Sequence, residues 1–426
     1  MLDLQFIRDH IDDVEKNIKN RFMKSDARKV LGLMELRTQA IVALESLRKS
    51  RNDNADKMKG KLTPEERTGL IEEGKRIKES ITSAELQVQQ SEAECFAAAR
   101  EVPNMTHPDA PIGKEDKDST EVARFGTIPQ FSFKALDHVQ LGEKLDIIDF
   151  EAGTKVAGTK FYFLKNEGVF LELALVRYTL DLLTKKGFTP FITPDIAKEE
   201  ILEGIGFNPR GAESNIYPLE GTGTCLVGTA EITLGGYHQN EILDLENGPV
   251  KMAGLSHCFR REAGAAGQFS KGLYRVHQFT KVEMFVYCKP EESEAIHAQL
   301  REIEEEIFST LGIPFRVVDT ATGDLGAPAY RKWDLEAWMP GRGEGGEWGE
   351  VTSTSNCTDY QARRLGIRYK DETGKTKFVH MLNGTAVACS RAMIAVLENF
   401  QQEDGSVIMP PALVPYLGFD RIKPRK

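Results

Sequence analysis

The stretch from Phe259 to Glu283 reads FRREAGAAGQFSKGLYRVHQFTKVE. Its second half, continued to Val286, is rich in β-branched and aromatic residues and predicts a β-strand over residues 273–286. Alternate side chains of a strand share one face, so six residues should point the same way: Arg275, His277, Phe279, Lys281, Glu283 and Phe285. A guanidinium, an aromatic ring and a carboxylate in one row can hold a phosphate, a base and an ammonium group. On this pattern alone, a half-buried hairpin with a polar solvent face is an equally good interpretation.

The first half of the stretch joins two arginines and a glutamate to a glycine-rich loop: Arg260, Arg261, Glu262, Gly264, Gly267 and Gly272. With the Gly-Leu-Tyr-Arg-Val-His-Gln-Phe that follows, it resembles motif 2 of class II aminoacyl-tRNA synthetases, in the form found in the seryl-tRNA synthetase family. Other segments resemble the family's motif 1, serine loop and motif 3: Gly187–Pro194, Gly228-Thr229-Ala230-Glu231, and Asn383-Gly384-Thr385 through Arg391 to Glu403-Asp404-Gly405. The resemblance extends over essentially the whole chain.

The resemblance implies an α+β fold. An N-terminal antiparallel α-helical coiled-coil arm precedes a class II catalytic domain, which is built on a mixed, mainly antiparallel β-sheet flanked by helices. The length agrees, because 426 residues are too many for one compact core. We expect three segments in the chain: a tRNA-binding domain at 1–110 with a helical hairpin near 27–101, a proline-rich linker at 111–128, and the catalytic domain at 129–426. Motifs 1, 2 and 3 are expected near 170–195, 254–286 and 380–415.

The N-terminal residues predict the helical hairpin by themselves. Apolar residues follow a heptad seam, first at Leu33, Ala40, Leu44, Leu47 and Met58, and then at Leu70, Ile77, Ile81, Ala84, Val88, Cys95, Ala98 and Val102. Between the two runs, Thr63, Pro64 and Glu66 predict an N-cap, a first helical position and a capping box.

This region is also locally basic. Residues 16–61 contain thirteen basic and five acidic residues, although the whole chain has a net charge of −10. Such a patch can attract a phosphate backbone, but a solvated helix face or a dimerisation rod is an open alternative. The resemblance implies that the arm binds the long variable arm of serine tRNA, with Arg28, Arg37, Lys49 and Arg51 as contact residues. It also implies a homodimer with motif 1 at the interface. Selenocysteine tRNA, which shares the long arm in the family, is a second candidate substrate.

For the activation step, the resemblance assigns ATP to residues of several motifs: Arg260, Arg261, Glu262, Arg275, Val276, Phe279, Glu350, Val351, Thr352, Ser353 and Arg391. Arg260 and Arg391 are the candidate catalytic residues, because a planar guanidinium binds phosphate bidentately. Phe279 is expected to stack on the adenine. Glu350 and Ser353 resemble the family's Mg²⁺ pair, and their oxygens are suitable ligands for that ion. The sequence has no P-loop, so side chains and metal have to hold the phosphates.

The resemblance assigns serine to Thr229, Ala230, Glu231, Glu283, Asn383 and Thr385. Glu283 lies four residues beyond Phe279, or about 13 Å along the same strand face, so nucleotide and amino acid can lie along one strand. A site built to hydrogen-bond a hydroxyl group rejects alanine, because its own polar groups would be left unpaired. The chain departs from many relatives at Arg261 and Thr385, where serine is usual, and its segment 340–350 is a few residues longer.

Composition narrows the class of protein. The six cysteines form no C-x-x-C pair, which favours reduced thiols over a disulfide framework or a zinc site. No apolar run approaches a membrane span, and the N-terminus lacks a signal-peptide core, so we expect a cytoplasmic protein without a membrane partner.

The hypothesis that the resemblance implies is an ATP- and Mg²⁺-dependent ligase that joins L-serine to tRNA. Two alternatives stay open: a paralogue that loads an amino acid onto a carrier protein, and a catalytically silent homologue. The basic arm argues against the first, and Arg260, Arg391 and Glu231 argue against the second.

Overall fold

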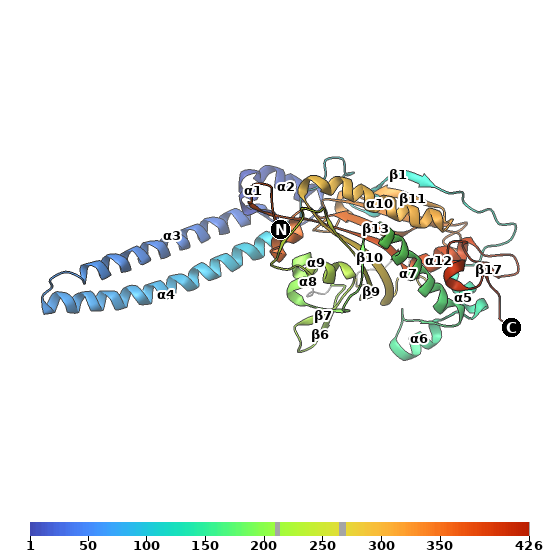
Figure 1. Ribbon diagram of the computed structural model, residues 1–426, viewed down its shortest axis with the longest axis horizontal. Helices are drawn as coiled ribbons and strands as arrows, with labels where there is room; N and C mark the ends of the chain where they lie inside the picture. Colours follow the sequence, from blue (N-terminus) through green and yellow to red (C-terminus); the bar gives the residue numbers. More distant parts are fainter. Residues whose placement is uncertain (209–213, 264–269, 426) are drawn as a thin grey trace. The chain divides into compact units, whose positions relative to one another are not determined.

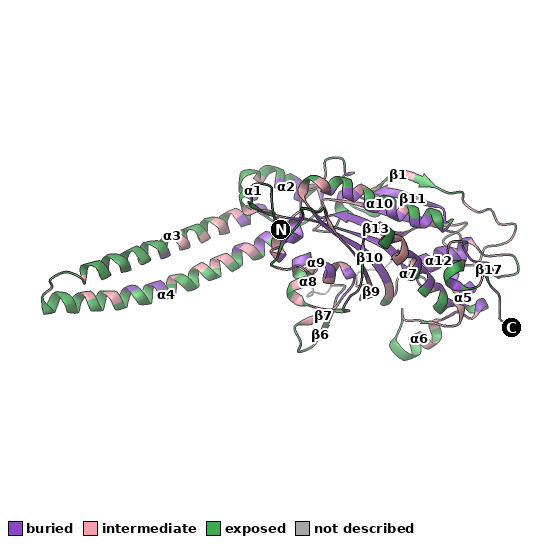
Figure 2. Cartoon of the chain, in the orientation of Figure 1, coloured by how far each residue is buried: buried purple, intermediate pink, exposed green. Residues whose placement is uncertain are grey.

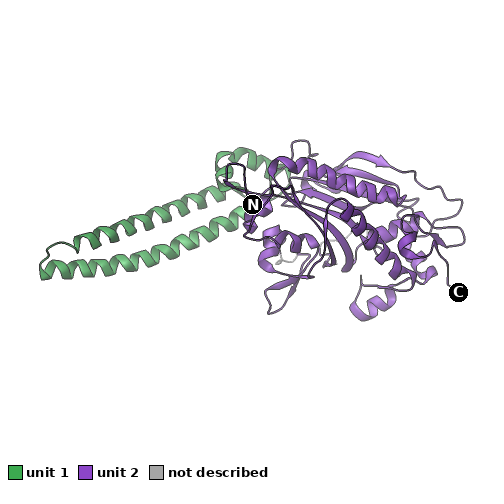
Figure 3. Cartoon of the chain, viewed as in Figure 1, with its two compact units in different colours: residues 1–105 green, residues 106–426 purple. Residues whose placement is uncertain are grey.

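The structure, a computed structural model, describes residues 1–208, 214–263 and 270–425. The chain divides into two compact units, Met1–Met105 and Thr106–Lys426 (Figure 3). Two residues of the predicted glycine-rich loop, Gly264 and Gly267, lie outside the described residues. In the part of the chain that is described, no helix is both long enough and apolar enough to span a membrane.

Unit 1 consists of α1 (Leu4–Asp9), α2 (Ile11–Asn20), α3 (Ala27–Lys57) and α4 (Pro64–Glu101). The two long helices, α3 and α4, pair side by side along their length (Figure 1). The predicted capping box at the start of α4 is confirmed. Thr63 Oγ1 accepts a hydrogen bond from Glu66 N at 3.2 Å, and Glu66 Oε2 accepts one from Thr63 N at 2.8 Å.

The seam between α3 and α4 is narrow, and most of the hairpin surface is exposed (Figure 2). Leu44, Ile77 and Ile81 form its buried apolar cluster. Polar residues of the seam also find partners across it. Asn54 Nδ2 donates to Leu70 O at 3.1 Å. The same nitrogen lies so close to Gly74 that a side chain at position 74 would crowd it. A polar residue within this apolar seam therefore makes a specific contact between the helices.

Unit 2 contains, among its described residues, an eight-stranded sheet in the order β1-β11-β12-β13-β16-β10-β9-β4. The strands in that order are β1 (Thr120–Phe125), β11 (Phe315–Asp319), β12 (Arg331–Met339), β13 (Glu347–Asn356), β16 (His380–Ala388), β10 (Gln278–Cys288), β9 (Val250–Phe259) and β4 (Thr189–Ile192). All neighbours are antiparallel except β4 and β9, which run parallel. The predicted α+β fold with a mainly antiparallel sheet is confirmed.

Three helices cover one face of this sheet: α7 (Glu167–Lys185), α10 (Ser293–Thr310) and α12 (Cys389–Asn399). They enclose the main apolar core with alternate residues of the strands, such as Val282, Met284 and Leu335. Helices α8 (Glu199–Ile205), α9 (Ala230–Gly236) and α11 (Tyr360–Leu365) enclose a second cluster around Phe285 and Tyr287, whose side chains leave β10 on the opposite face. The remainder of that opposite face carries the candidate site.

Shorter elements complete unit 2: α5 (His138–Leu145), α6 (Phe150–Ala157), α13 (Val414–Leu417), β2 (Ile148–Asp149), β3 (Phe163–Leu164), β5 (Ile196–Lys198), β6 (Tyr217–Leu219), β7 (Thr224–Leu226), β8 (Ile242–Leu243), β14 (Arg368–Lys370), β15 (Thr376–Phe378), β17 (Val407–Ile408) and β18 (Arg421–Ile422). Single 3₁₀ turns lie at Asp116–Asp118, Pro290–Glu292 and Thr322–Asp324.

The predicted strand over residues 273–286 is wrong in its first part, because β10 begins only at Gln278. The preceding residues are anchored to α5 instead of the sheet. Gly272 has a φ of +56°, and a Cβ atom there would lie 2.2 Å from His138 Nε2. Leu273 N donates to that same nitrogen at 3.1 Å, and His138 Nδ1 contacts Glu398 Oε1 at 2.8 Å. The chain leaves the sheet here because Gly272 and Leu273 contact His138, which is far away in the sequence. Local β propensity cannot predict such a contact.

A buried glutamate lies beneath the sheet on the helical side. Glu304 of α10 is 1% exposed, and its Oε2 accepts a hydrogen bond from Thr352 Oγ1 at 3.0 Å. Burial raises the pKa of Glu304 well above its usual value, and nearby carboxylates raise it further. Burial therefore favours the protonated, uncharged form of this side chain.

We predict that Glu304→Gln stabilises unit 2 increasingly as the pH rises. A carboxyl group whose pKa is raised by folding lowers the free energy of unfolding above its unfolded pKa, by up to about 1.4 kcal/mol per pH unit. The neutral amide avoids that loss. Thermal unfolding of the variant and the parent chain between pH 5 and 8 tests this, with the exposed Glu302→Gln on the same helix as control. A difference in melting temperature that does not change with pH would contradict it.

Candidate active site

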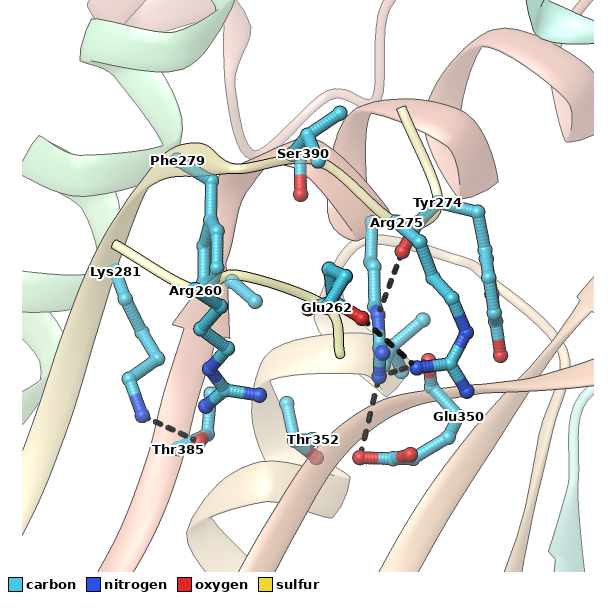
Figure 4. Close-up of a pocket in the computed structure, with 14 residues that line it drawn as sticks. Arg260, Glu262, Tyr274, Arg275, Phe279, Lys281, Glu350, Thr352, Thr385 and Ser390 are labelled. Carbon is cyan, nitrogen blue, oxygen red and sulfur yellow. Dashed lines mark hydrogen bonds and ion pairs between the residues drawn. The ribbon is translucent and has the colours of Figure 1, made fainter. Parts of the chain in front are cut away.

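A pocket on the open face of the sheet collects residues from β10, β13, α12 and the segment before β10 (Figure 4). Nine of the eleven residues predicted to bind ATP line it: Arg260, Glu262, Arg275, Val276, Phe279, Glu350, Val351, Thr352 and Arg391. The other two, Arg261 and Ser353, do not line this pocket. Arg261 is exposed, and its backbone N donates to Asn215 O at 2.9 Å.

Arg391 of α12 holds one end of the pocket together. Its Nη1 donates to Glu350 O at 3.0 Å and pairs with Glu350 Oε1 at 3.1 Å. Its guanidinium also lies 4.8 Å from the centre of the Tyr274 ring. Desolvation would raise the pKa of Glu350, but the charges of Arg391, Lys332 and Arg260 outweigh it and hold the pKa below its usual value. A carboxylate that stays ionised beside a guanidinium suits a site for phosphate and a cation.

A β-bulge in β13 brings Glu350 and Ser353 to the same face. Glu350 lies opposite Glu336 of β12, whereas Ser353 lies opposite Asp334, so Val351 is the additional residue. In a regular strand, residues three apart point to opposite faces. Both oxygen-bearing side chains of the predicted metal pair therefore stand on the open face, although Ser353 lies beyond the pocket lining.

Arg260 occupies the other end of the pocket. Its Nε donates to Gly228 O at 3.3 Å, and its guanidinium lies 5.4 Å from the centre of the Phe279 ring. Glu262 has a φ of +50°, a conformation that non-glycine residues rarely adopt outside special sites. Its side chain is 9% exposed and pairs with Arg275 Nη1 at 3.2 Å. The backbone here is thus bent to place a carboxylate and a guanidinium at the pocket wall.

The residues predicted to bind serine form two contact pairs. Glu283 of β10 lies opposite Thr385 of β16, whose Oγ1 donates to Glu283 Oε2 at 3.3 Å. Asn383 Nδ2 donates to Glu231 Oε1 at 3.1 Å. Thr229 caps the N-terminus of α9 by accepting from Glu231 N at 3.2 Å. Ala230 is fully buried in the second apolar cluster, so its side chain faces the core.

Glu231 has an unusual electrostatic environment. Its Oε1 accepts hydrogen bonds from two neutral amides, Gln361 Nε2 at 2.8 Å and Asn383 Nδ2 at 3.1 Å. Burial, followed by the charge of Glu283, raises the pKa of Glu231 to about 7, and Gln361, Lys281 and Arg260 only partly oppose this shift. The side chain therefore titrates near neutral pH.

Two residues of the site received no role from sequence reasoning. Lys281 stands in the predicted row of β10 side chains, and in the structure it is buried and ion-paired with Glu283. Strand alternation could have placed it, but no motif signals its function. Tyr274 lines the pocket with both Arg342 and Arg391 over its ring, and it reaches that place only because the chain leaves the sheet before Gln278.

The four basic residues predicted to bind tRNA differ in their surroundings within unit 1. Arg28 pairs with Glu15 and Asp12, and Arg37 pairs with Glu92 of α4 at 2.8 Å. Lys49 and Arg51 are exposed on α3. Arg37 thus also joins the two helices, whereas Lys49 and Arg51 face solvent.

Known proteins match both units. Residues 1–106 match the family model "Seryl-tRNA synthetase N-terminal domain", and residues 220–400 match "tRNA synthetase class II core domain (G, H, P, S and T)". The serine–tRNA ligase of Treponema denticola is 69% identical to this chain, covering 99% of it and 100% of the relative. The chain belongs to the seryl-tRNA synthetase family. The serine–tRNA ligase of Treponema pallidum is 56% identical, with both chains covered completely.

Solved structures of the seryl-tRNA synthetase family have the same fold. The synthetase of Pyrococcus horikoshii, solved in complex with ATP, is 39% identical and superposes with a TM-score of 0.90 over 100% of both chains. The cytoplasmic enzyme of Naegleria fowleri, in complex with AMP, is 32% identical with a TM-score of 0.87, covering 100% of this chain and 99% of that one. Identity and fold therefore agree over both units.

We predict that this member of the family binds L-serine more tightly as the pH rises from 6 to 8. An ammonium ligand needs ionised Glu231, and a carboxyl with a pKa of about 7 becomes ionised in this interval. The affinity should rise about tenfold, with proton release on binding. Isothermal titration calorimetry in buffers of different ionisation enthalpy measures both effects. Glu231→Gln should remove the pH dependence, and a flat profile for the parent chain would contradict the prediction.

Proposed function

We propose that this chain activates L-serine with ATP and transfers the seryl group to the 3′ end of serine tRNA. One observation carries the proposal. A single face of β10 bears Phe279, Lys281 and Glu283, with the Arg260 guanidinium at 5.4 Å from the aromatic ring. Sites for a base, a phosphate and an amino acid are thereby contiguous. The Pyrococcus horikoshii structure with ATP and the serine–tRNA ligase of Treponema denticola support the same assignment.

In the first step, a carboxylate oxygen of serine attacks the α-phosphorus of ATP, an anhydride bond forms, and pyrophosphate leaves. The reaction requires alignment and charge neutralisation more than an acid or a base. We assign Arg260 to the serine carboxylate and the α-phosphate, and Phe279 to stacking on the adenine. Arg391 and Tyr274 contact each other, and we assign them to the remainder of the nucleotide.

Glu350 and Ser353 fit the requirements of a Mg²⁺ site. Their side chains share the open face of β13, and the Glu350 side chain is 44% exposed with a lowered pKa. Oxygen ligands of this kind suit Mg²⁺, which neutralises phosphate charge when it is bound. Arg391 keeps the Glu350 carboxylate oriented toward the pocket through its contact at 3.1 Å.

Serine selection is assigned to the two contact pairs. We assign the ammonium group to Glu231, which contacts Asn383, and the side-chain hydroxyl group to Glu283 with Thr385, which contact each other. Glu283 and Thr385 are both at least nine-tenths buried, so a ligand without a hydroxyl group would leave their polar groups unpaired. In the second step, the 3′-terminal ribose hydroxyl of tRNA attacks the seryl carbonyl, an ester forms, and AMP leaves.

The N-terminal unit is proposed as the tRNA-binding domain, with unit 2 from about residue 129 as the catalytic domain. Its helical hairpin would bind the long variable arm through phosphates and shape. A homodimer through motif 1 is supported by apolar side chains that unit 2 exposes on α7 and β4, with Phe170 at 55% and Ile192 at 85% exposure. The six cysteines are all buried, and buried thiols fit a cytoplasmic location.

We predict that Mg²⁺ separates the roles of Glu350 and Arg391. Glu350→Gln removes a charge that binds the metal, so raising Mg²⁺ should partly restore serine-dependent ATP–pyrophosphate exchange by mass action. Arg391→Ala removes positioned donors that no ion replaces, so its exchange rate should stay low throughout. A Mg²⁺ titration of both variants tests this. Equal rescue of the two, or parental activity of Glu350→Gln at all concentrations, would remove Glu350 from the metal site.

We predict that the arm acts only in the tRNA-dependent step. Replacing exposed Lys49 and Arg51 by Ala should leave pyrophosphate exchange intact, weaken tRNA binding and make its salt dependence shallower. Adding Arg28→Ala and Arg37→Ala should weaken it further, and Arg37→Ala should also loosen the pairing of α3 with α4. Lys75→Ala with Lys78→Ala on the exposed surface of α4 removes the same charge and serves as control. Normal aminoacylation by the quadruple variant at physiological salt would make the arm a passive rod.

A further inference from the structure

Lys281 forms the most deeply buried ion pair of the amino-acid subsite. Its side chain is 6% exposed and that of Glu283 is 2% exposed, and the two are in direct contact. Lys281 Nζ also lies 3.4 Å from Thr385 Oγ1 (Figure 4). Thr385 Oγ1 itself donates to Glu283 Oε2 at 3.3 Å. The three groups form a closed triangle on adjacent strands β10 and β16. A buried ammonium group that lines the pocket requires a functional or a structural explanation.

The two carboxylates of the subsite differ in their partners. Glu231 accepts hydrogen bonds from the neutral amides of Gln361 and Asn383. Glu283 is instead paired with the cation Lys281. A ligand ammonium group can therefore neutralise Glu231, whereas at Glu283 it would have to compete with a fixed ammonium group at close range. A neutral hydroxyl group has no such conflict, because it can donate to a carboxylate oxygen that is already charge-balanced.

We propose that Lys281 is a specificity-determining residue, which balances the charge of Glu283 so that the subsite accepts a neutral hydroxyl-bearing side chain and excludes a cationic one of the same size. The inference rests on the proposed function, because it assigns Glu283 and Thr385 to the side-chain end of the bound amino acid. Without Lys281 the same end carries an unbalanced carboxylate. It then favours a side chain that ends in an ammonium group.

The probe is L-2,3-diaminopropionate, which has the length of serine and an amine in place of the hydroxyl group. We would measure kcat/KM for both amino acids by ATP–pyrophosphate exchange in the parent chain and in Lys281→Met. The ratio of diaminopropionate to serine activity should rise about tenfold or more in the variant, since charge complementarity at a buried site discriminates strongly. A loss of packing alone lowers both activities and cannot produce such a gain for one of them.

Three further variants define the cause. Lys281→Arg keeps the charge and should keep the parental ratio. Lys281→Met combined with Glu283→Gln removes both charges and should lose the gain for diaminopropionate. Lys332→Met is the control. Lys332 is also paired with a carboxylate, Asp334 at 3.3 Å, but it lies outside the triangle. The ratio of diaminopropionate to serine activity should therefore not change in this variant.

An unchanged ratio in Lys281→Met, together with a normal thermal shift on ATP binding, would overturn the proposal. So would strong competition by diaminopropionate in the parent chain, with an inhibition constant equal to the KM for serine, and this measurement does not depend on whether a variant folds. Absence of serine-dependent exchange in the parent chain would refute the proposed function itself, which is a different outcome. Serine-dependent exchange in the parent chain supports the proposed function. Exclusion of diaminopropionate by the parent chain, but not by Lys281→Met, supports the role of Lys281.

Discussion

The antiparallel register between β10 and β16 is the constraint on which the candidate site depends. It places Glu283 opposite Thr385 and Lys281 opposite Ala388, with a bulge between the two pairs. Because alternate residues of β10 enter the apolar core, the remaining ones are forced onto the open face. A slip of one residue would bury these charges against α7 and α10 and expose Val282 and Met284, so the same hydrophobic pattern that stabilises the sheet also fixes the site.

Contacts from outside the sheet position the remaining residues of the pocket. Arg391 reaches the pocket from α12, and Arg260 from the end of the hydrogen-bonded β9 strand. The segment before β10 is held by His138 of α5, which is held in turn by Glu398 of α12. The position of Tyr274 and Arg275 therefore depends on a buried histidine–glutamate pair far away in the sequence. Tertiary contacts of this kind fix the pocket wall without supplying any group to it.

The sequence predicted the fold class, the helical hairpin with its capping box, and most of the pocket. Strand alternation correctly put Phe279, Lys281 and Glu283 on one face, because β10 is regular there. It failed over residues 273–277, where Gly272 adopts a positive φ to approach His138. Alternation also gave no reason for Glu350 and Ser353 to share a face, since that depends on the β13 bulge at Val351. Local propensity cannot detect a bulge or a distant partner, so these features required the structure.

Three glutamates of unit 2 show why residue type alone does not assign a role. Glu283 is paired with Lys281, Glu231 lies between neutral amides with a pKa of about 7, and burial raises the pKa of Glu304 well above its usual value. They are therefore a charge-balanced acceptor, a carboxyl group that titrates near neutral pH, and a carboxyl group whose protonated form is favoured by burial. The sequence alone does not distinguish these three glutamates. Their different chemistry arises from the partner that the fold brings to each: a cation, an amide or a threonine hydroxyl. Function in this site is thus decided by pairs of residues, and a substitution at the partner changes the role of a glutamate that has not itself been altered.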